Sequence, residues 1–375
     1  MIKNIAIISP NENAYSESFI KAHKKIKGNI YFYYKGHIPT LLENYGTVTY
    51  CKECLRTPFT TLKRILRPSL LLYPKSFNLK KRLLAQSFKK NKINYVLAEY
   101  GPCAVEIMDI CEYLNIPLIA HFHGYDISVK DILDENKETY PKLFNIAYKI
   151  IVVSKVMEKK VIELGCPKEK ILYNPCGPDD SYFNIRPHYN TNNIISIGRF
   201  VDKKSPYYII LAFKSVLKEI PDAKLTMIGN GLLWECCKNI AAYLKIEQNI
   251  NFIGFTEHKN IQQYLEDSSL FIQSSITSIS GDQEGTPVSV MEASLAGLPI
   301  VSTLHAGIPD VILNNETGIL LKEHDIEGFS NAIVKLLKNK KEAKRLGDNG
   351  KQYIYKNFKL SISIQRIENI IYNIV

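Results

Sequence analysis

Two series of short apolar segments, separated by longer amphipathic stretches, set the strongest constraint on how this 375-residue chain can fold. Apolar runs of four or five residues between polar turns are typical of buried parallel strands, and the amphipathic stretches are typical of helices that cover both faces of a sheet. The chain therefore predicts an α/β protein with two doubly wound, Rossmann-like domains. Strands are expected at 5–8, 30–34, 95–98, 117–121 and 149–153, and again at 194–197, 224–228, 250–253, 270–273 and 300–302.

The stretch between the two series has the composition of a linker. Prolines and glycine punctuate 175–187, and a polar run follows at 188–193. Two doubly wound domains that meet at the carboxyl ends of their strands form a cleft, and ligands in such folds bind there. We expect a first domain at 1–187, a second at 188–355, and a helix at 356–375 that packs back on the first domain.

Composition excludes several classes of protein. With 46% apolar residues, the chain has no stretch near the eighteen or so apolar residues needed to cross a bilayer. The apolar run at 1–10 ends in proline and predicts a first strand rather than a signal peptide. The eight cysteines are expected as reduced thiols. Cys51 and Cys54 have zinc-ligand spacing without a second pair, so no metal site is expected. We expect a cytoplasmic protein, or one lying on the inner face of the plasma membrane.

The net charge of +11 is concentrated in the segment 52–92, where Glu53 is the one acidic residue. Apolar residues interleave with the cations, as in segments that lie on an anionic membrane surface or hold a phosphate-bearing acceptor. A solvated helix face that covers the core explains the same pattern. No recognisable nucleic-acid-binding motif accompanies the charge, so no nucleic-acid partner is expected. The cations are Lys52, Arg56, Lys63, Arg64, Arg67, Lys75, Lys80, Lys81, Arg82, Lys89, Lys90 and Lys92.

The segment 281–303 places two carboxylates around a helix start suited to an anion. Pro287 fits the first helical position, and Gly297 ends the helix before a buried strand. Free N–H groups and the helix dipole at this start favour phosphate. Glu292, two turns along, is placed to accept hydrogen bonds from ribose hydroxyls, and Glu284 lies on the preceding loop. For the spacing alone, a plain strand-to-helix turn is an alternative. The expected ligand-binding residues are Gly285, Thr286, Pro287, Val288 and Glu292.

A second motif follows the strand at 194–197. Gly198 allows the backbone to approach a ligand closely, and Arg199 offers a planar fork for phosphate oxygens. Lys204 adds a second, mobile cation. Together they would stabilise negative charge on a departing diphosphate. A surface Arg/Lys pair is the alternative when the motif is taken alone.

Other polar residues also follow strands. His123, next to glycine, is placed to hydrogen-bond a ligand or to cap the next helix. Asp126 is suited to a helix cap or to contact with a hydroxyl. Gly229 belongs to a Gly-Asn-Gly turn that is half of a dinucleotide fingerprint.

These motifs together resemble the signature of the retaining family 4 glycosyltransferases, which have the GT-B fold, and especially bacterial exopolysaccharide and lipopolysaccharide sugar transferases. The resemblance implies that Arg199 and Lys204 bind the donor diphosphate, and that His123 and Glu284 position the donor sugar. These four are the expected catalytic residues. It also implies that Gly198, Gly229 and Gly254 lie near the nucleotide.

The acceptor side departs from the family. The loop after the first strand, residues 9–18, lacks the glycines that are usual there, although Ser16 and Glu17 begin a sequence similar to a version found in exopolysaccharide transferases. The resemblance implies an acceptor side that includes Ser16, Glu17, Tyr100, Gly101 and Asp126.

The resemblance implies an enzyme that moves a hexosyl or related sugar from a nucleoside-diphosphate donor, UDP- or GDP-linked, to a glycan acceptor. The nucleotide sugar is a co-substrate, and no other cofactor is expected. The expected acceptor is linked to undecaprenyl diphosphate. The alternatives are a GT-B sugar epimerase and a non-catalytic nucleotide- or membrane-binding scaffold. A dinucleotide oxidoreductase is disfavoured because the full Gly-x-Gly-x-x-Gly is missing.

Overall fold

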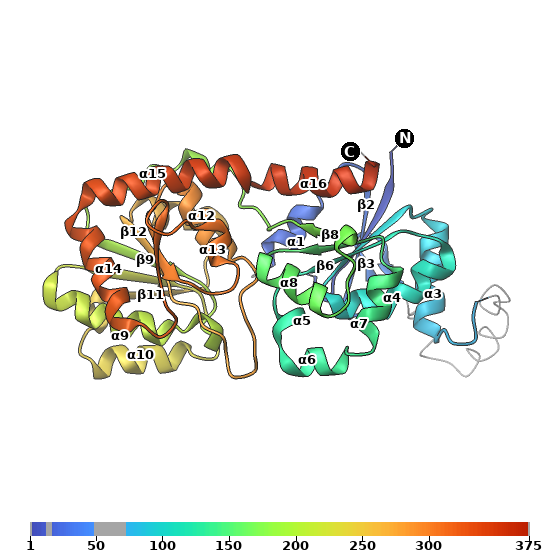
Figure 1. Cartoon of the computed structure of the whole chain (residues 1–375), viewed down its shortest axis with the longest axis horizontal. Helices are drawn as coiled ribbons and strands as arrows, with labels where there is room; N and C mark the ends of the chain where they lie inside the picture. Colours follow the sequence, from blue (N-terminus) through green and yellow to red (C-terminus); the bar gives the residue numbers. More distant parts are fainter. Residues whose placement is uncertain (1, 13–16, 49–72, 374–375) are drawn as a thin grey trace.

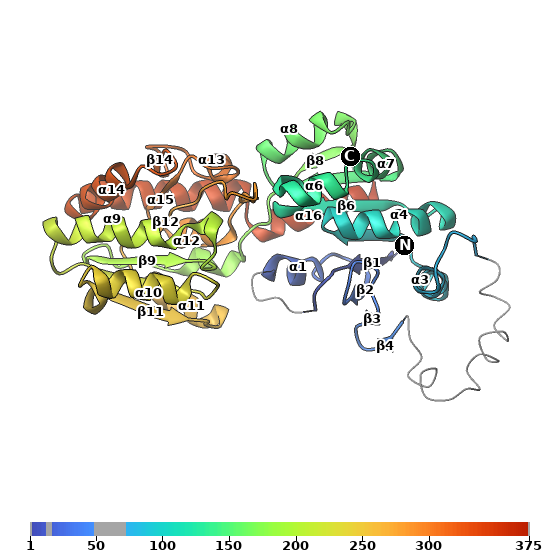
Figure 2. The same ribbon diagram turned by 90° about the horizontal axis from the view of Figure 1, so that it is seen from below.

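The structure is a computed structural model that describes residues 2–12, 17–48 and 73–373. Two sheets lie side by side along the long axis of the molecule, each with helices on both faces (Figures 1 and 2). The two predicted doubly wound domains are therefore confirmed. All ten predicted strands are present, and each end lies within one residue of its prediction.

The sheet of the first domain has the order β4-β3-β2-β1-β5-β6-β7-β8. Its strands are parallel except for the short β3 and β4, which pair antiparallel with their neighbours. Ile5 to Ile8 in β1 are completely buried, as expected of a central strand covered on both faces. The strands are β1 (Asn4–Ile8), β2 (Asn29–Tyr34), β3 (Leu41–Leu42), β4 (Gly46–Thr47), β5 (Tyr95–Glu99), β6 (Leu118–Phe122), β7 (Lys149–Val152) and β8 (Ile171–Tyr173).

Helices connect these strands across both faces of the sheet (Figure 2). Some begin at side-chain caps: Asn78 accepts from the backbone N–H of Lys81, and Ser154 from that of Met157. The helices of this domain are α1 (Ser18–His23), α3 (Leu79–Lys90), α4 (Gly101–Leu114), α5 (Tyr125–Ser128), α6 (Lys130–Glu135), α7 (Thr139–Ile146) and α8 (Lys155–Glu163), with 3-10 turns η3 (Lys168–Lys170) and η4 (Asp180–Asn184).

The sheet of the second domain is parallel, with the order β11-β10-β9-β12-β13-β14. The chain reverses its direction of winding at β9, which pairs with β10 on one side and β12 on the other. Loops at such a switch point open a crevice for ligands. The strands are β9 (Asn193–Ile197), β10 (Lys224–Ile228), β11 (Ile250–Gly254), β12 (Leu270–Gln273), β13 (Ile300–Thr303) and β14 (Gly318–Leu321).

The helices of the second domain include α12, which lies within the predicted two-carboxylate segment 281–303. Gly297 ends α12 in a left-handed conformation (φ 102°), as predicted. Pro287, however, was predicted at the first helical position and is instead the N-cap with extended backbone, so the helix begins one residue later, at Val288. The helices are α9 (Pro206–Glu219), α10 (Trp234–Tyr243), α11 (His258–Glu266), α12 (Val288–Ala296), α13 (Ile308–Val311), α14 (Ile326–Lys338) and α15 (Lys340–Asn357), with η5 (Asp202–Lys204) and η6 (Glu247–Asn249).

The last helix, α16 (Leu360–Tyr372), follows α15 and lies on the first domain, near β1 (Figure 1). Leu360, Ile364, Ile367 and Ile371 are buried in one cluster with residues of β1. The crossing is tight at Gly177, where a Cβ atom would lie 2.2 Å from the carbonyl oxygen of Phe358. The final helix therefore joins the two domains through packed side chains.

Only part of the basic segment 52–92 belongs to the described residues. There, α3 buries Leu84, Ala85 and Phe88 against the core, which fits a helix that covers the sheet. Lys81 forms an ion pair with Asp109 at 2.8 Å. Residues 52–72, and with them Cys54, lie outside the described residues, as does Cys51. Membrane contact by this segment stays a prediction.

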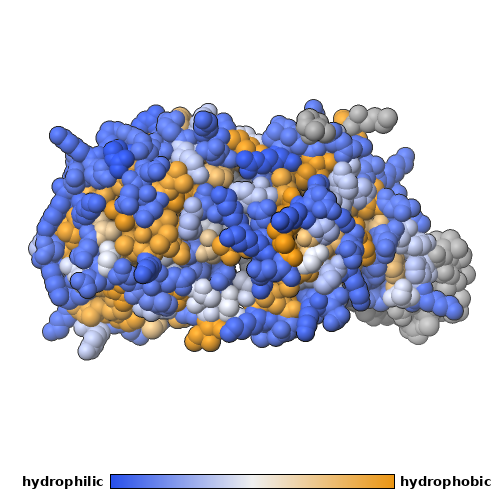
Figure 3. Space-filling view, in the orientation of Figure 1, coloured by the Kyte–Doolittle hydropathy of each residue, from blue (hydrophilic) through white to orange (hydrophobic). Residues whose placement is uncertain are grey.

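The face in Figure 3 mixes hydrophilic and hydrophobic residues. Among the described residues, no helix is long and apolar enough to cross a membrane.

Candidate active site

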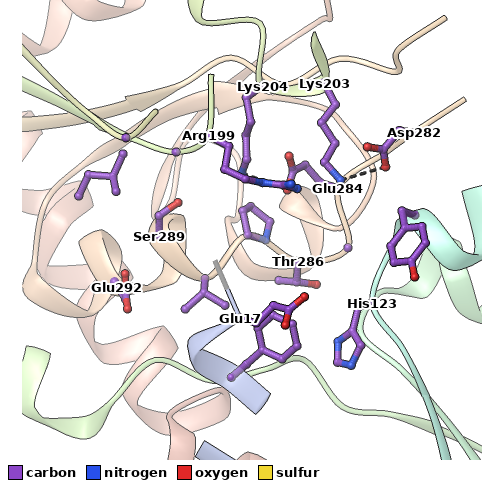
Figure 4. Close-up of a pocket in the computed structure, with 18 of the residues that line it drawn as sticks. Glu17, His123, Arg199, Lys203, Lys204, Asp282, Glu284, Thr286, Ser289 and Glu292 are labelled. Carbon is purple, nitrogen blue, oxygen red and sulfur yellow. Dashed lines mark hydrogen bonds and ion pairs between the residues drawn. The ribbon is translucent and has the colours of Figure 1, made fainter. Parts of the chain in front are cut away.

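A cavity of about 730 Å³ lies between the two domains, at the carboxyl ends of their strands (Figure 4). Both domains line it, as predicted for two sheets that face one cleft. The predicted residues that line it are Glu17, Tyr100, His123, Gly198, Arg199, Lys204, Gly229, Glu284, Gly285, Thr286, Pro287, Val288 and Glu292.

The basic pair enters the cavity from the end of β9. The end of β10 can approach the end of β9 this closely because Gly229 has no side chain: a Cβ atom on Gly229 would lie 1.9 Å from the carbonyl oxygen of Gly198. Arg199 is exposed at the cavity. Lys204 is largely buried, and its Nζ lies 3.1 Å from Oε2 of Glu284. Arg199, Lys204 and Glu284 line the same cavity (Figure 4), so the predicted phosphate-binding and sugar-positioning groups meet there.

The charges of this pair depend on one another. Burial alone would raise the pKa of Glu284, but the charges of Lys204 and Lys203 outweigh it and hold the pKa below its usual value. Burial also lowers the pKa of Lys204, and Glu284 opposes that effect. Oε1 of Glu284 makes no hydrogen bond to any described residue, so it keeps an acceptor for a ligand.

The loop that carries Glu284 is held by a histidine behind it. The backbone N–H of Glu284 donates to Nε2 of His305 at 3.1 Å, and Nδ1 of His305 lies 2.6 Å from Oε1 of Glu323. Because Nε2 accepts, the ring proton is on Nδ1, where the carboxylate of Glu323 receives it. His305 therefore holds the backbone of Glu284 in place and does not itself line the cavity.

The same loop docks on the first domain. Thr286 donates its hydroxyl to the carbonyl of Val153, and the backbone N–H of Gln283 donates to Oγ of Ser128 at 3.1 Å. Within the second domain, Lys203, which precedes Lys204 in the basic motif, forms an ion pair with Asp282 of this loop at 2.9 Å. In this structure the two domains are therefore closed around the cavity.

The start of α12 faces the cavity from the second domain. The N–H groups of Val288 and Ser289 have no carbonyl one helical turn earlier to accept from them, which is true of any helix start and suits an anion. Glu292 is buried one turn deeper (Figure 4). Burial raises its pKa to about 7; a hydrogen bond from Tyr182 opposes this and the charge of Asp179 adds to it.

The wall from the first domain is aromatic. The hydroxyl of Tyr100 donates to Oε1 of Glu17 at 2.9 Å, and the ring of Tyr100 contacts those of His123 and Tyr125. Tyr100 has a φ of 74°, a conformation that is uncommon outside glycine and that concentrates at functional sites. Phe19 and Tyr125, which the sequence reasoning did not select, also line this wall.

Among the described residues, three of the predicted ones do not line the cavity. Asp126 is buried, and its carboxylate accepts from the backbone N–H groups of Gly101, His123 and Gly124 at 3.0 Å, so it clamps the loop of His123 rather than facing a sugar. Gly101 starts α4 beneath that clamp. Gly254 lies behind the cavity wall, where its carbonyl accepts from the N–H of Gly229 at 2.8 Å. Ser16 lies outside the described residues.

Two doubly wound domains with a basic pair and a helix start facing one cleft define a GT-B glycosyltransferase. The family described as "Glycosyl transferases group 1" matches residues 180–353. Amylovoran biosynthesis glycosyltransferase AmsK of Erwinia amylovora is 32% identical over 292 residues, which are 73% of this chain and 71% of that protein. The chain therefore belongs to the group 1 glycosyltransferases, and the predicted class of enzyme is confirmed.

Other relatives agree with this assignment. N-acetyl-alpha-D-glucosaminyl L-malate synthase of Bacillus anthracis is 26% identical over 71% of this chain and 72% of its own length. Among solved structures, Alr3699/HepE of Anabaena in complex with UDP superimposes with a TM-score of 0.76 over 100% of both chains, at 15% identity. That likeness shows the GT-B fold.

Proposed function

We propose that this glycosyltransferase moves a sugar from a UDP- or GDP-linked donor to a glycan or lipid-linked oligosaccharide in the synthesis of a bacterial surface polysaccharide. One observation carries the proposal: Glu292, the basic pair and His123 follow one another along a single cavity (Figure 4). That order matches ribose, diphosphate and sugar along a nucleotide sugar. AmsK, named for amylovoran biosynthesis, supports the polysaccharide assignment.

The proposed chemistry needs cations where the leaving group forms. As the bond from the sugar C1 to the diphosphate breaks, negative charge grows on the phosphate oxygens. Arg199, Lys204 and the start of α12 stabilise this charge. The acceptor hydroxyl attacks C1 from the same face and gives its proton to the departing phosphate, so the anomeric configuration is retained and no protein base is required.

We assign the acceptor to the aromatic wall of the first domain. Tyr100, Tyr125 and Phe19 present ring surface, and Glu17 adds a carboxylate that accepts hydrogen bonds from hydroxyls. An acceptor linked to undecaprenyl diphosphate would extend toward an anionic membrane, which the basic segment 52–92 would contact.

The proposal is tested by thermal shift with UDP, GDP, ADP, CMP and NAD. A ligand at 100 times its Kd stabilises by about 2.7 kcal/mol, which raises the melting temperature by a few degrees in a chain of this size. Of these five compounds, we expect only UDP or GDP to raise the melting temperature of the wild type. Arg199→Ala should lose that shift and slow donor turnover by roughly tenfold to a hundredfold, since a charged hydrogen bond contributes about 1.5–3 kcal/mol. A folded protein that responds to none of the nucleotides would refute the assignment.

Donor affinity is expected to depend on pH through Glu292. Its pKa is raised to about 7, and the ionised carboxylate accepts stronger hydrogen bonds from ribose hydroxyls than the neutral acid does. Binding therefore releases a proton, and affinity falls by up to about tenfold for each pH unit below 7. Isothermal titration with UDP-glucose and GDP-mannose between pH 5.5 and 8.5 measures this, because their diphosphates do not titrate in that range.

Glu292→Gln is the matched control. It should bind the donor weakly at every pH, with no slope near pH 7. The carboxylate's raised pKa in the folded state stabilises the protein only at low pH, and this contribution is lost as the pH rises through about 7. The glutamine variant should therefore melt higher than the wild type at pH 8. An unchanged slope in this variant would assign the pH dependence to another group.

A further inference from the structure

A carboxylate that the proposed reaction does not use lies among three histidines beneath the cavity. Glu99 ends β5 and is 0% exposed. Its Oε1 lies 2.6 Å from Nδ1 of His23 in α1. Its Oε2 lies 2.7 Å from Nε2 of His123 and 3.3 Å from Nδ1 of His121. Of these four side chains, His123 is the one that lines the cavity.

The distances between these atoms fit hydrogen bonds rather than ligands of a shared zinc ion. Two ligands of a tetrahedral zinc ion, each about 2.0–2.1 Å from it, lie more than 3 Å apart. The contacts of Glu99 with His23 and His123, at 2.6 and 2.7 Å, are shorter than that. Their lengths are those of charge-assisted hydrogen bonds. Both histidines are therefore donors to one carboxylate.

Burial and the neighbouring histidines determine which of these side chains are charged. Burial alone would raise the pKa of Glu99, but the charge of His23 and the hydrogen bonds from the histidines hold it well below its usual value. His121 is buried and its pKa is lowered to about 3, so it is neutral. His23 is thus the counter-charge that an ionised carboxylate needs in the interior.

The remaining nitrogen of His123 faces a thiol. Sγ of Cys176 lies 3.9 Å from Nδ1 of His123, and burial raises the pKa of Cys176 well above its usual value, so the thiol keeps its proton. A protonated thiol is a weak donor, and Nδ1 is its acceptor. His123 therefore carries its ring proton on Nε2, where Glu99 receives it.

We propose that Glu99 is a positioning residue for sugar transfer: it fixes the ring orientation and the tautomer of His123, and His23 balances its charge. The inference rests on the proposed function, which places His123 beside the donor sugar. It also joins the two sides of the site, because α1 carries His23 and begins directly after Glu17 of the acceptor wall. The arrangement is similar to other carboxylate–histidine pairs, in which the carboxylate sets the tautomer.

Glu99→Gln tests this with little change of shape, because the amide nitrogen replaces one acceptor with a donor. We expect release of UDP or GDP from a panel of UDP- and GDP-sugars to slow by roughly tenfold to a hundredfold, which is the effect of a small misplacement at the reacting centre. The Kd values of free UDP and GDP should not change, because they do not reach His123. Glu99→Asp keeps the charge and should recover part of the rate.

The outcomes separate the two proposals. Wild type that turns over no nucleotide sugar contradicts the proposed function. Wild type that is active beside an equally active Glu99→Gln variant overturns the role of Glu99. So does a loss of free-nucleotide affinity equal to the loss of rate, since this indicates a purely structural residue.

A second measurement needs no variant and applies if Glu99→Gln does not fold. The ¹⁵N chemical shifts of the His123 ring in the wild type should show a protonated Nε2 and an unprotonated Nδ1. The opposite tautomer overturns the proposal. One tightly bound zinc ion per purified chain also overturns it, because zinc would take the nitrogens that the proposal assigns to protons.

Discussion

Replacing Lys204 with alanine is expected to slow sugar transfer by about a hundredfold or more, and to lower the melting temperature of the protein. The lysine stabilises charge on the leaving diphosphate, and removing one such preorganised group costs about 100- to 1,000-fold in rate. Its Nζ also lies 3.1 Å from Oε2 of Glu284, and both side chains are largely buried. Breaking a buried pair leaves an uncompensated charge, at a cost of about 3–5 kcal/mol. Nucleotide-sugar turnover and thermal melting measure the two effects.

A double variant separates stability from catalysis. Lys204→Met with Glu284→Gln removes both charges, so most of the lost stability should return while transfer stays low. Transfer by Lys204→Ala at the wild-type rate would exclude the lysine from the mechanism. Melting of the double variant as low as that of the single variant would show that the two side chains do not act as a buried ion pair.

Most strands could be predicted because central parallel strands are buried on both faces and their sequences are therefore continuously apolar. The same reasoning missed β8 and β14. Ile171–Tyr173 in β8 is a half-buried edge strand of three residues, and β14 begins with Gly318, which looks like part of a turn. β3 and β4 have two residues each, too few for any periodicity.

The site could be predicted where one motif contains both the element and the functional residue. Arg199 and Lys204 follow their strand within seven residues, and Glu284 and Glu292 flank one helix start. Contacts between distant segments could not be predicted in this way. His23 and Glu99 are 76 residues apart in the sequence. The sequence signal for Glu99 is a glutamate at the end of an otherwise apolar strand, and its meaning depends on which histidines the fold brings to it.

Gly285→Ala is expected to open the cavity between the two domains. A Cβ atom at this residue would lie 2.5 Å from the carbonyl oxygen of His123 and 2.7 Å from Cγ2 of Val153, both in the first domain. Real Cβ atoms do not approach so closely, so the loop must move away from His123. Because Glu284 is the preceding residue, it moves as well. A displacement of about 1 Å at the reacting centre costs roughly a hundredfold in rate, which is the expected loss of transfer.

The affinity for free UDP or GDP should fall far less in Gly285→Ala, because Arg199 and Glu292 both belong to the second domain and move with the nucleotide.

Gly165→Ala is the matched control. Gly165 has a φ of 94°, so alanine there strains the backbone. A Cβ atom at this position, however, meets nothing within 4 Å. This variant should lose some stability and keep its rate of transfer. If Gly285→Ala transferred sugar as fast as Gly165→Ala, close contact between this loop and the strand end of His123 would not be needed for catalysis. The cavity would then have to function in a more open arrangement of the domains than the one described here.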